Sequence, residues 1–400
     1  MMSVALENLE KFKDILHRCY KCQYCRTTGP NLFYEGCPSY VKFGYETFTG
    51  GGRMWMARGL VEGELNLSED IVDILFACPT CGNCSNQCIY PIKDNILQII
   101  EATRAEAVKA GVKLPGRQRD FGVHLGKEHN PYMEPHSSRL DWLPNDIDLP
   151  EKSETVYFVG CTSSYRQKML AQDTVEVFRK AGVDFTIMRD EWCCTSPLLR
   201  TGQWETDYVS APEIAQHNVE EAKKAGAERI VTTCAGCYRT WKKDYLQEYD
   251  WLLGSKHEFE VLHTTQLLEN MIKDGEIELT NEINLKVTYH DPCHLGRHMF
   301  VYDSPRNVLK AIPGIELVEM PRTRENAWCC GSGGGVKSGY GDWSVEVAYE
   351  RVKEAEKLGV DAIVSACPFC WRNLDDAIKQ YNSKLKMYDV IQLVRQSMGI

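Results

Sequence analysis

The eighteen cysteines of this 400-residue chain constrain its structure more than any other feature, because they fall into four spaced groups with none left over. Thiolates repeated at short spacing are typical metal ligands, since several must converge on one ion or cluster. The first two groups have four members each and the last two have five. The groups are Cys19, Cys22, Cys25, Cys37; Cys78, Cys81, Cys84, Cys88; Cys161, Cys193, Cys194, Cys234, Cys237; and Cys293, Cys329, Cys330, Cys367, Cys370.

Disulfide bonds are the main alternative use for so many cysteines. They require an oxidising compartment and are typical of short, loop-rich chains. The first residues of this chain lack an apolar signal core, and no apolar run reaches the ~18 residues that a membrane span requires. We therefore expect a soluble cytoplasmic protein, free or held at the membrane through a partner subunit, whose thiols stay reduced.

Charge excludes one class of partner. The net charge is −10 and no dense run of Lys and Arg occurs, which argues against a nucleic-acid surface.

The first part of the chain is predicted to be a small helical module, residues 1–110, that surrounds the first eight cysteines. A linker, residues 111–152, follows it; five prolines and weak periodicity predict that this segment runs over the surface. The predicted helices of the module are residues 5–18, 53–62, 69–76 and 95–110.

From residue 153 onward, short apolar strands alternate with charged helices, which predicts α/β units. The predicted strands are residues 155–160, 183–188, 228–233, 286–290, 315–320 and 361–365. The predicted helices include residues 167–181, 212–225 and 345–358.

An internal repeat divides this region into two lobes, residues 153–275 and 276–400. Trp-Cys-Cys occurs at 192–194 and again at 328–330, and CAGCYR at 234–239 matches CPFCWR at 367–372. In both lobes the cysteines come just after predicted strands. Ligands of open α/β sheets bind at the carboxyl ends of strands, so we expect one cysteine-lined site in each lobe.

The module cysteines predict two cubane clusters. Cys78-x2-Cys81-x2-Cys84-x3-Cys88 has the spacing of the bacterial ferredoxin run, whose fourth cysteine ligates the neighbouring cluster. By this crossover Cys88 joins Cys19, Cys22 and Cys25, and Cys37 joins Cys78, Cys81 and Cys84. The long insertion before Cys37 leaves the crossover open. Zinc is the competing ion, but its knuckles come as cysteine pairs, so the triplets favour [4Fe–4S].

Adjacent cysteines, as at 193–194 and 329–330, can serve two different irons of a larger cluster. The pattern Cys293…Cys329-Cys330-Gly331…Cys367-x2-Cys370 resembles the CCG domain of the heterodisulfide reductase iron–sulfur subunit family. The first set matches the same pattern, with Thr195 where the motif has glycine. The resemblance covers nearly the whole chain, because residues 1–110 resemble the ferredoxin-type part that is fused to two CCG domains in this family.

The resemblance implies a fold, cofactors and a reaction. The fold class is α+β/α/β: an N-terminal all-helical two-cluster ferredoxin-like module followed by two repeated α/β lobes. Each set of five cysteines would hold one noncubane [4Fe–4S] cluster, in addition to the two cubane [4Fe–4S] clusters. Electrons would enter through the module, and a disulfide of the coenzyme M–coenzyme B type would be split between the two noncubane clusters.

Several other side chains are candidates for the site. Arg239, Arg297 and Arg372 follow cluster cysteines and could bind an anionic substrate, although solvated helix-start positions would also explain them. Of the three histidines around Cys293, we rank His294 first as proton donor, with a structural role as the alternative. Gly331 and Gly333 belong to a glycine run without a phosphate-loop frame, which indicates close backbone approach to the cluster.

The same motifs allow a second function. The chain could be a non-catalytic subunit that relays electrons between a flavoprotein dehydrogenase and a quinone or cytochrome partner. In either case we expect other subunits of an electron-transfer complex, a flavoprotein or a membrane cytochrome subunit, as partners. Retention of all five cysteines in both lobes favours reduction of a small-molecule disulfide.

Overall fold

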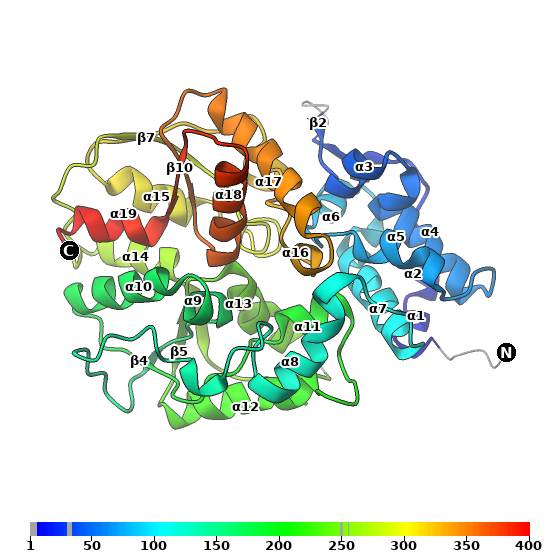
Figure 1. Ribbon diagram of the computed structural model, residues 1–400, viewed down its shortest axis with the longest axis horizontal. Helices are drawn as coiled ribbons and strands as arrows, with labels where there is room; N and C mark the ends of the chain where they lie inside the picture. The colour runs from blue at the N-terminus through cyan, green and yellow to red at the C-terminus, as the bar shows by residue number, and fades with distance from the viewer. Residues whose placement is uncertain (1–5, 30–33, 249–250, 255) are drawn as a thin grey trace.

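The computed structural model describes residues 6–29, 34–248, 251–254 and 256–400 (Figure 1). Residue 5, the expected start of the first helix, lies outside the described residues. The N-terminal module occupies one end of the long axis, and the two lobes lie against each other beside it.

The N-terminal module is built from short helices around an apolar core. Leu9, Met54, Ile99 and Ile100 are almost fully buried in it. The predicted helices are present, but the all-helical expectation is not confirmed, because β1 (Thr27–Thr28) pairs with β2 (Tyr34–Glu35) in an antiparallel ladder. The helices are α1 (Glu7–Glu10), α2 (Lys13–Leu16), α3 (Pro38–Phe43), α4 (Gly50–Val61), α5 (Val72–Phe76), α6 (Asn83–Gln87) and α7 (Ile96–Lys109).

Each lobe contains a four-stranded parallel sheet, and the two sheets have the same strand order. In both, the first strand of the lobe lies between the second and the third, and the fourth lies beyond the third. The repeat inferred from the cysteines is therefore a repeat of topology. The strands are β3 (Thr155–Tyr157), β4 (Thr186–Ile187), β5 (Arg229–Thr232) and β6 (Glu260–His263), then β7 (Leu285–Tyr289), β8 (Ile315–Leu317), β9 (Ala362–Ser365) and β10 (Lys386–Asp389).

Six strands fall where the sequence predicts them, but β6 and β10 were not predicted. Both are fourth strands that end directly in a helix cap: His263 caps α14 (Thr264–Lys273) and Asp389 caps α19 (Val390–Ser397), each in a capping box. The remaining helices of the lobes are α9 (Cys161–Tyr165), α10 (Lys168–Lys180), α11 (Ser196–Thr201), α12 (Ala211–Lys224), α13 (Ala235–Arg239), α15 (Asp303–Ala311), α16 (Val336–Gly339), α17 (Gly341–Glu356) and α18 (Pro368–Gln380), with a π-helical stretch at Thr240–Glu248.

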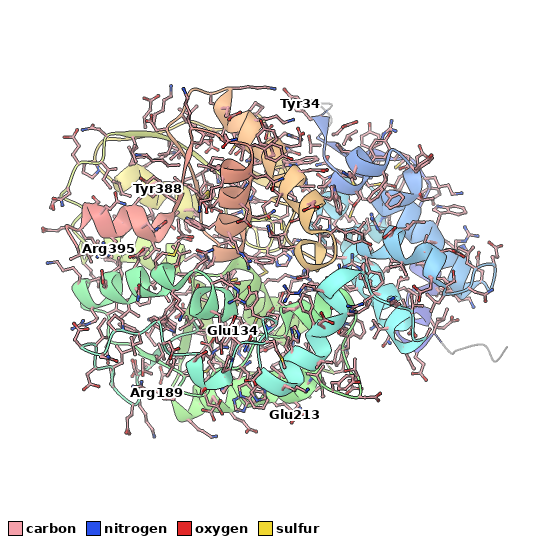
Figure 2. All side chains as sticks on the ribbon, viewed as in Figure 1. Tyr34, Glu134, Arg189, Glu213, Tyr388 and Arg395 are labelled. Carbon is pink, nitrogen blue, oxygen red and sulfur yellow. The ribbon has the colours of Figure 1, made fainter. Side chains whose placement is uncertain are left out.

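The lobes pack through two equivalent helix pairs. Helix α10 contacts α19, and α14 contacts α15, so each lobe contributes one helix of each kind to the interface. Arg395 of α19 (Figure 2) forms ion pairs with Asp173 and Glu176 of α10. Asn307 of α15 donates a hydrogen bond of 2.6 Å to Glu269 of α14. These two helix–helix contacts hold the two sheets in one relative orientation.

The expectation that residues 111–152 run over the surface is wrong for part of this segment. It contains α8 (Phe121–Glu128), and Leu125, Asn130 and Trp142 within it are fully buried. The Asn130 side chain donates hydrogen bonds to the carbonyls of Glu128 and Glu134. These bonds satisfy backbone groups that no helix or strand pairs, which allows this irregular backbone to be buried. Pro135 and Pro150 are exposed, whereas Pro115, Pro131 and Pro144 are half-buried.

Arg104 of α7 joins the module to both lobes. Its guanidinium is fully buried and donates hydrogen bonds to the carbonyls of Leu75 and Cys78 in the module, of Arg200 in the first lobe, and of Gly334 in the second. Five N–H donors in a rigid fork can satisfy several converging carbonyls at once.

We expect Arg104→Met to destabilise the protein strongly, because it leaves these buried carbonyls without donors. Each unsatisfied group costs about 1–3 kcal/mol, so the midpoint of chemical denaturation should fall clearly. Arg58→Met is the matched control: Arg58 lies on the outer side of α4 in an i,i+4 pair with Glu62, which is worth about 0.3–0.5 kcal/mol. Equal midpoints for the two variants would contradict the bridging role.

Candidate functional site

The cysteines of both lobes lie at the carboxyl ends of the parallel strands, as predicted. Cys161 begins α9, directly after the short link 158–160 that follows β3, and Cys234 follows β5 as the N-cap of α13. Cys367 follows β9 in the same way, as the N-cap of α18. Because all strands of a sheet run in one direction, each set of five converges at one sheet edge.

The two sets face a common cavity of about 310 Å³ between the lobes. Nine of the ten lobe cysteines line this cavity. The thiols of Cys234 and Cys367 lie close enough to shift each other's pKa, so a cysteine of the first lobe approaches one of the second. The lining cysteines are Cys161, Cys193, Cys194, Cys234 and Cys237 of the first lobe and Cys293, Cys330, Cys367 and Cys370 of the second.

The donor set fits iron–sulfur clusters. All eighteen cysteines lie in the described residues and none forms a disulfide. Hydrogen bonds from Cys161 and Cys194, together with burial, raise the pKa of Cys193 well above its ordinary value. Buried thiolates repel one another, so a bound cation is needed to keep such a set ionised. Gly160 leaves room beside the set, because a Cβ there would lie 2.9 Å from Cys237 Sγ.

The thiols of the two module groups lie close to one another. Cys88 interacts electrostatically with Cys22 and Cys25 of the first group. Cys37, in turn, interacts with Cys78 and Cys81 of the second group. Burial raises the pKa of Cys37 to about 12, and a nearby Arg53 opposes that effect. Each fourth member therefore lies near thiols of the other group, which is the arrangement that the crossed ligand sets would require.

The module and the second lobe also meet through cysteines. The Cys329 thiol hydrogen-bonds to Cys81, which, with the charge of Arg297, lowers the pKa of Cys81 to about 6. Arg297 is buried at this junction and donates a hydrogen bond of 2.7 Å to the Cys81 carbonyl. Arg297 thus ties the second lobe to the module, and it is not among the described residues that line the cavity.

Arg239 lies in a buried ionic network behind the cavity. It is 3.4 Å from Asp244 and 3.8 Å from Glu101 of α7. Arg200 contacts the same two carboxylates, and all four side chains are at most 2% exposed. Of these four residues only Arg200 lines the cavity. The position of Arg239 suits an electrostatic role better than direct contact with a substrate.

His294 and Arg372 do line the cavity. Burial, together with the charges of Arg239 and Arg200, lowers the pKa of His294 well below its ordinary value. Its Nε2 finds no hydrogen-bond partner within the described part of the chain. His298 is not among the described residues that line the cavity; its ring lies 4.5 Å from that of His294 and against Gly82 of the module, where a Cβ would come within 2.8 Å of its Nε2.

The glycine run serves two contacts. Gly331 N–H donates a hydrogen bond of 3.3 Å to Cys329 Sγ, as expected for close approach to a cluster ligand. Gly333 lies against the module, since a Cβ there would be 2.5 Å from the Pro79 carbonyl. Gly334 approaches the Cys78 carbonyl in the same way. The glycines therefore let the second lobe reach the cysteine loop of the module.

Sequence reasoning missed the contribution of residues 111–152 to the cavity. The Tyr132 hydroxyl and Thr162 Oγ1 form a hydrogen bond of 2.9 Å, and Arg139 donates a hydrogen bond of 3.7 Å to Cys161 Sγ. No periodic pattern marks these residues, so only the tertiary structure identifies them. The cavity-lining members of the segment are Arg117, Phe121, His124, Pro131 and Tyr132.

Two domain families match this chain. The 4Fe-4S dicluster domain matches residues 15–92, and the cysteine-rich CCG domain matches residues 155–242 and 287–375. These matches define a class of iron–sulfur oxidoreductase chain in which a dicluster domain precedes two cysteine-rich domains. A hypothetical protein from Helicobacter pylori shares the fold alone, with a TM-score of 0.51 at 12% identity over 98% of this chain and 72% of that chain.

Curated relatives identify the family. The chain is 44% identical to the D-type component of dihydromethanophenazine:CoB–CoM heterodisulfide reductase of Methanosarcina mazei, over 83% of this chain and 80% of that protein. It is 32% identical to the B-type component of fumarate reductase (CoM/CoB) of Methanothermobacter marburgensis, over 80% of this chain and 61% of that protein. The chain belongs to the family of the D-type heterodisulfide reductase component.

Among the described residues, no helix combines the length and the apolar character that crossing a bilayer requires.

The residue after each adjacent cysteine pair is threonine in the first lobe and glycine in the second, and exchanging the two residue types should affect stability unequally. Thr195 and Gly331 both have positive φ, +69° and +83°. We expect Thr195→Gly to change the free energy of unfolding by less than about 1–2 kcal/mol, since glycine adopts this conformation freely. Gly331→Thr should cost more than about 2 kcal/mol, because a Cβ would lie 2.7 Å from both Ser344 O and Val347 Cβ. Denaturation midpoints of the two variants check this order.

Proposed function

We propose that this chain binds two cubane and two noncubane [4Fe–4S] clusters and reduces a disulfide in the cavity between the lobes. The single observation that carries the proposal is the cavity itself, which brings the cysteines of both lobes to one space. The ligand sets would be the two crossed groups of the module and the five cysteines of each lobe, as assigned from the sequence.

The reaction cleaves one S–S bond, consumes two electrons and two protons, and yields two thiols. The clusters, when bound, would supply the electrons one from each lobe. His294 is our candidate for donating a proton, because it lines the cavity and its Nε2 has no hydrogen-bond partner among the described residues. Burial, Arg239 and Arg200 lower its pKa, and the negative charge at the Cys330 sulfur opposes them and favours the protonated ring. Seven of the nine cysteines that line the cavity are buried, which limits the access of water to the reacting sulfurs.

The cavity favours an anionic disulfide. Cationic side chains from both lobes and from residues 111–152 surround it, and some have partners that fix their positions. Lys337 donates hydrogen bonds to Asn373 and Asp376, and Arg166 pairs with Glu134. The cations are Arg117, Arg166, Arg200, Lys337 and Arg372. A relative acts, by its name, on the CoB–CoM heterodisulfide, and we propose a disulfide of that type as substrate.

Electrons would enter through the module. Cys22 of the first group is exposed, and Tyr20, Tyr24 and Ile89 are exposed large side chains of the module. We propose that this side is the docking surface for a flavoprotein or a membrane cytochrome. The contact between Cys81 and Cys329 supports transfer from the second cluster of the module to the second lobe.

The cluster assignment predicts about sixteen irons per chain, four for each cluster. We expect Cys194→Ser and Cys330→Ser each to lower the iron content to about twelve, because each removes a ligand from one lobe only. Iron analysis with EPR of the reduced protein checks both numbers. The two variants control for each other, since each keeps the cluster of the opposite lobe. About eight irons in the wild type, or stoichiometric zinc, would contradict the assignment.

Reduced viologen with an anionic heterodisulfide tests the reaction. We expect turnover by the wild type, and a loss of ~10²-fold or more in His294→Gln at unchanged iron content, because general acid catalysis contributes that much. His257→Gln is the matched control, since His257 is buried against the Trp241 carbonyl and is not among the described residues that line the cavity.

The second candidate is an electron relay, which the relation to EtfAB:quinone oxidoreductase of Syntrophomonas wolfei favours. The two chains are 30% identical over 84% of this chain and 48% of that protein. If fully loaded, reducible protein gave no turnover with disulfide but reduced a quinone analogue, the relay would replace the disulfide reductase.

A further inference from the structure

His290 is a fully buried histidine that the reaction described above does not use. It directly follows β7, and its backbone N–H donates a hydrogen bond of 2.8 Å to the Val364 carbonyl of the neighbouring strand β9. Ser365 Oγ donates a hydrogen bond of 3.2 Å to the His290 carbonyl. The sheet therefore fixes the backbone from which this imidazole projects.

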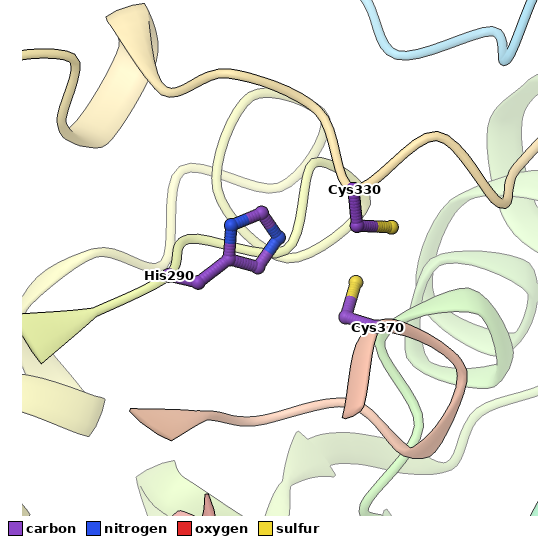
Figure 3. Close-up of side chains that lie close together, drawn as sticks. All are labelled: His290, Cys330 and Cys370. Carbon is purple, nitrogen blue, oxygen red and sulfur yellow. The ribbon is translucent and has the colours of Figure 1, made fainter. Parts of the chain in front are cut away.

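The imidazole lies beside two cysteines of the second lobe. One ring nitrogen of His290 and the Sγ atoms of Cys330 and Cys370 all lie within 4.8 Å of one another. Figure 3 shows the ring with one nitrogen toward the two sulfurs and the other turned away from them. No other histidine shares a cysteine-containing group of this kind among the described residues.

Arg351 of α17 determines which nitrogen carries the hydrogen. Its Nε donates a hydrogen bond of 3.3 Å to His290 Nδ1, and the guanidinium is held by the Arg322 carbonyl and by Glu354. Since an arginine can only donate, Nδ1 must accept, and the hydrogen of the neutral ring is on Nε2. Nε2 has no hydrogen-bond partner in the described part of the chain, so its N–H is available to the sulfur side.

The first lobe has no such donor at the equivalent position. Phe158 follows β3 as His290 follows β7, and its backbone N–H makes the corresponding 2.8 Å hydrogen bond, to the Val231 carbonyl. Its ring packs edge-on against Trp241. The side chain that donates to a sulfur of the first lobe is Arg139 of residues 111–152, which contacts Cys161 and pairs with Glu191. The two lobes thus place their donors at different cysteines of the set.

We propose that His290 is a positioning residue that donates its Nε2–H to the sulfurs of the cluster in the second lobe, and so makes this cluster easier to reduce than it would be with an apolar neighbour. The inference rests on the proposed function, because it takes the ten lobe cysteines as ligands of two clusters. Hydrogen bonds to the sulfurs stabilise the added negative charge and are one of the determinants of iron–sulfur potentials.

The test replaces His290 with the residue of the first lobe. We expect His290→Phe to lower the midpoint potential of one of the two noncubane clusters by ~59 mV, which corresponds to a tenfold change in the equilibrium constant of its one-electron reduction. The other cluster should not move. His290→Gln, which keeps an N–H donor, should shift less. EPR-monitored redox titration of the intact, iron-loaded protein measures all of these values.

Phe158→Leu is the matched control, because it exchanges one apolar side chain for another at the equivalent position and should leave the second-lobe cluster unchanged. Equal potentials in wild type and His290→Phe, at equal iron content, would overturn the inference while leaving the cluster assignment intact. Absence of the two extra clusters from the wild type would instead refute the proposed function.

A measurement on the wild type does not depend on the stability of the variants. Pulsed ENDOR of protein with ¹⁵N-labelled histidine, in ordinary and in heavy water, should show one noncubane cluster coupled to an imidazole nitrogen and to an exchangeable proton. No such coupling on either cluster would overturn the inference.

Discussion

The buried guanidinium of Arg104 is the interaction on which the arrangement of the three parts depends. A fully buried cation is tolerated only when all its donors have acceptors, and here the carbonyls come from the module and from both lobes. If any of the three parts moved away, a buried charge would lose an acceptor. The requirement therefore fixes the module against both lobes, with Cys81 beside Cys329.

The cavity follows from the same requirement together with the parallel sheets. Parallel strands place all loops that bear cysteines at one edge of each sheet. The packing of α10 against α19 and of α14 against α15 then turns the two edges toward each other. Glycines permit the final approach: Gly333 and Gly334 of the second lobe meet the backbone of Pro79 and Cys78 without side chains between them. Residues 111–152 line a further part of the cavity.

The repeated lobes are alike in topology and unlike in chemistry. Both contain five cysteines, the same strand order and the same capping box after the fourth strand. They differ in the groups that contact sulfur, with Arg139 at Cys161 in the first lobe and His290 near Cys330 in the second. A two-electron reaction that uses two one-electron centres does not require the centres to be equal, and unequal surroundings allow their potentials to be set separately.

The sequence by itself determined the cysteine groups, the internal repeat and six of the eight lobe strands, because ligand spacing and apolar runs are local features. Strands β6 and β10 escaped prediction since four residues beside a helix cap carry little pattern. Only the tertiary structure decided the roles of Arg239, Arg297 and residues 111–152. Burial and hydrogen-bond partners come from segments far apart in the chain, and no spacing records that Arg297 reaches Cys81 or that Arg351 orients His290.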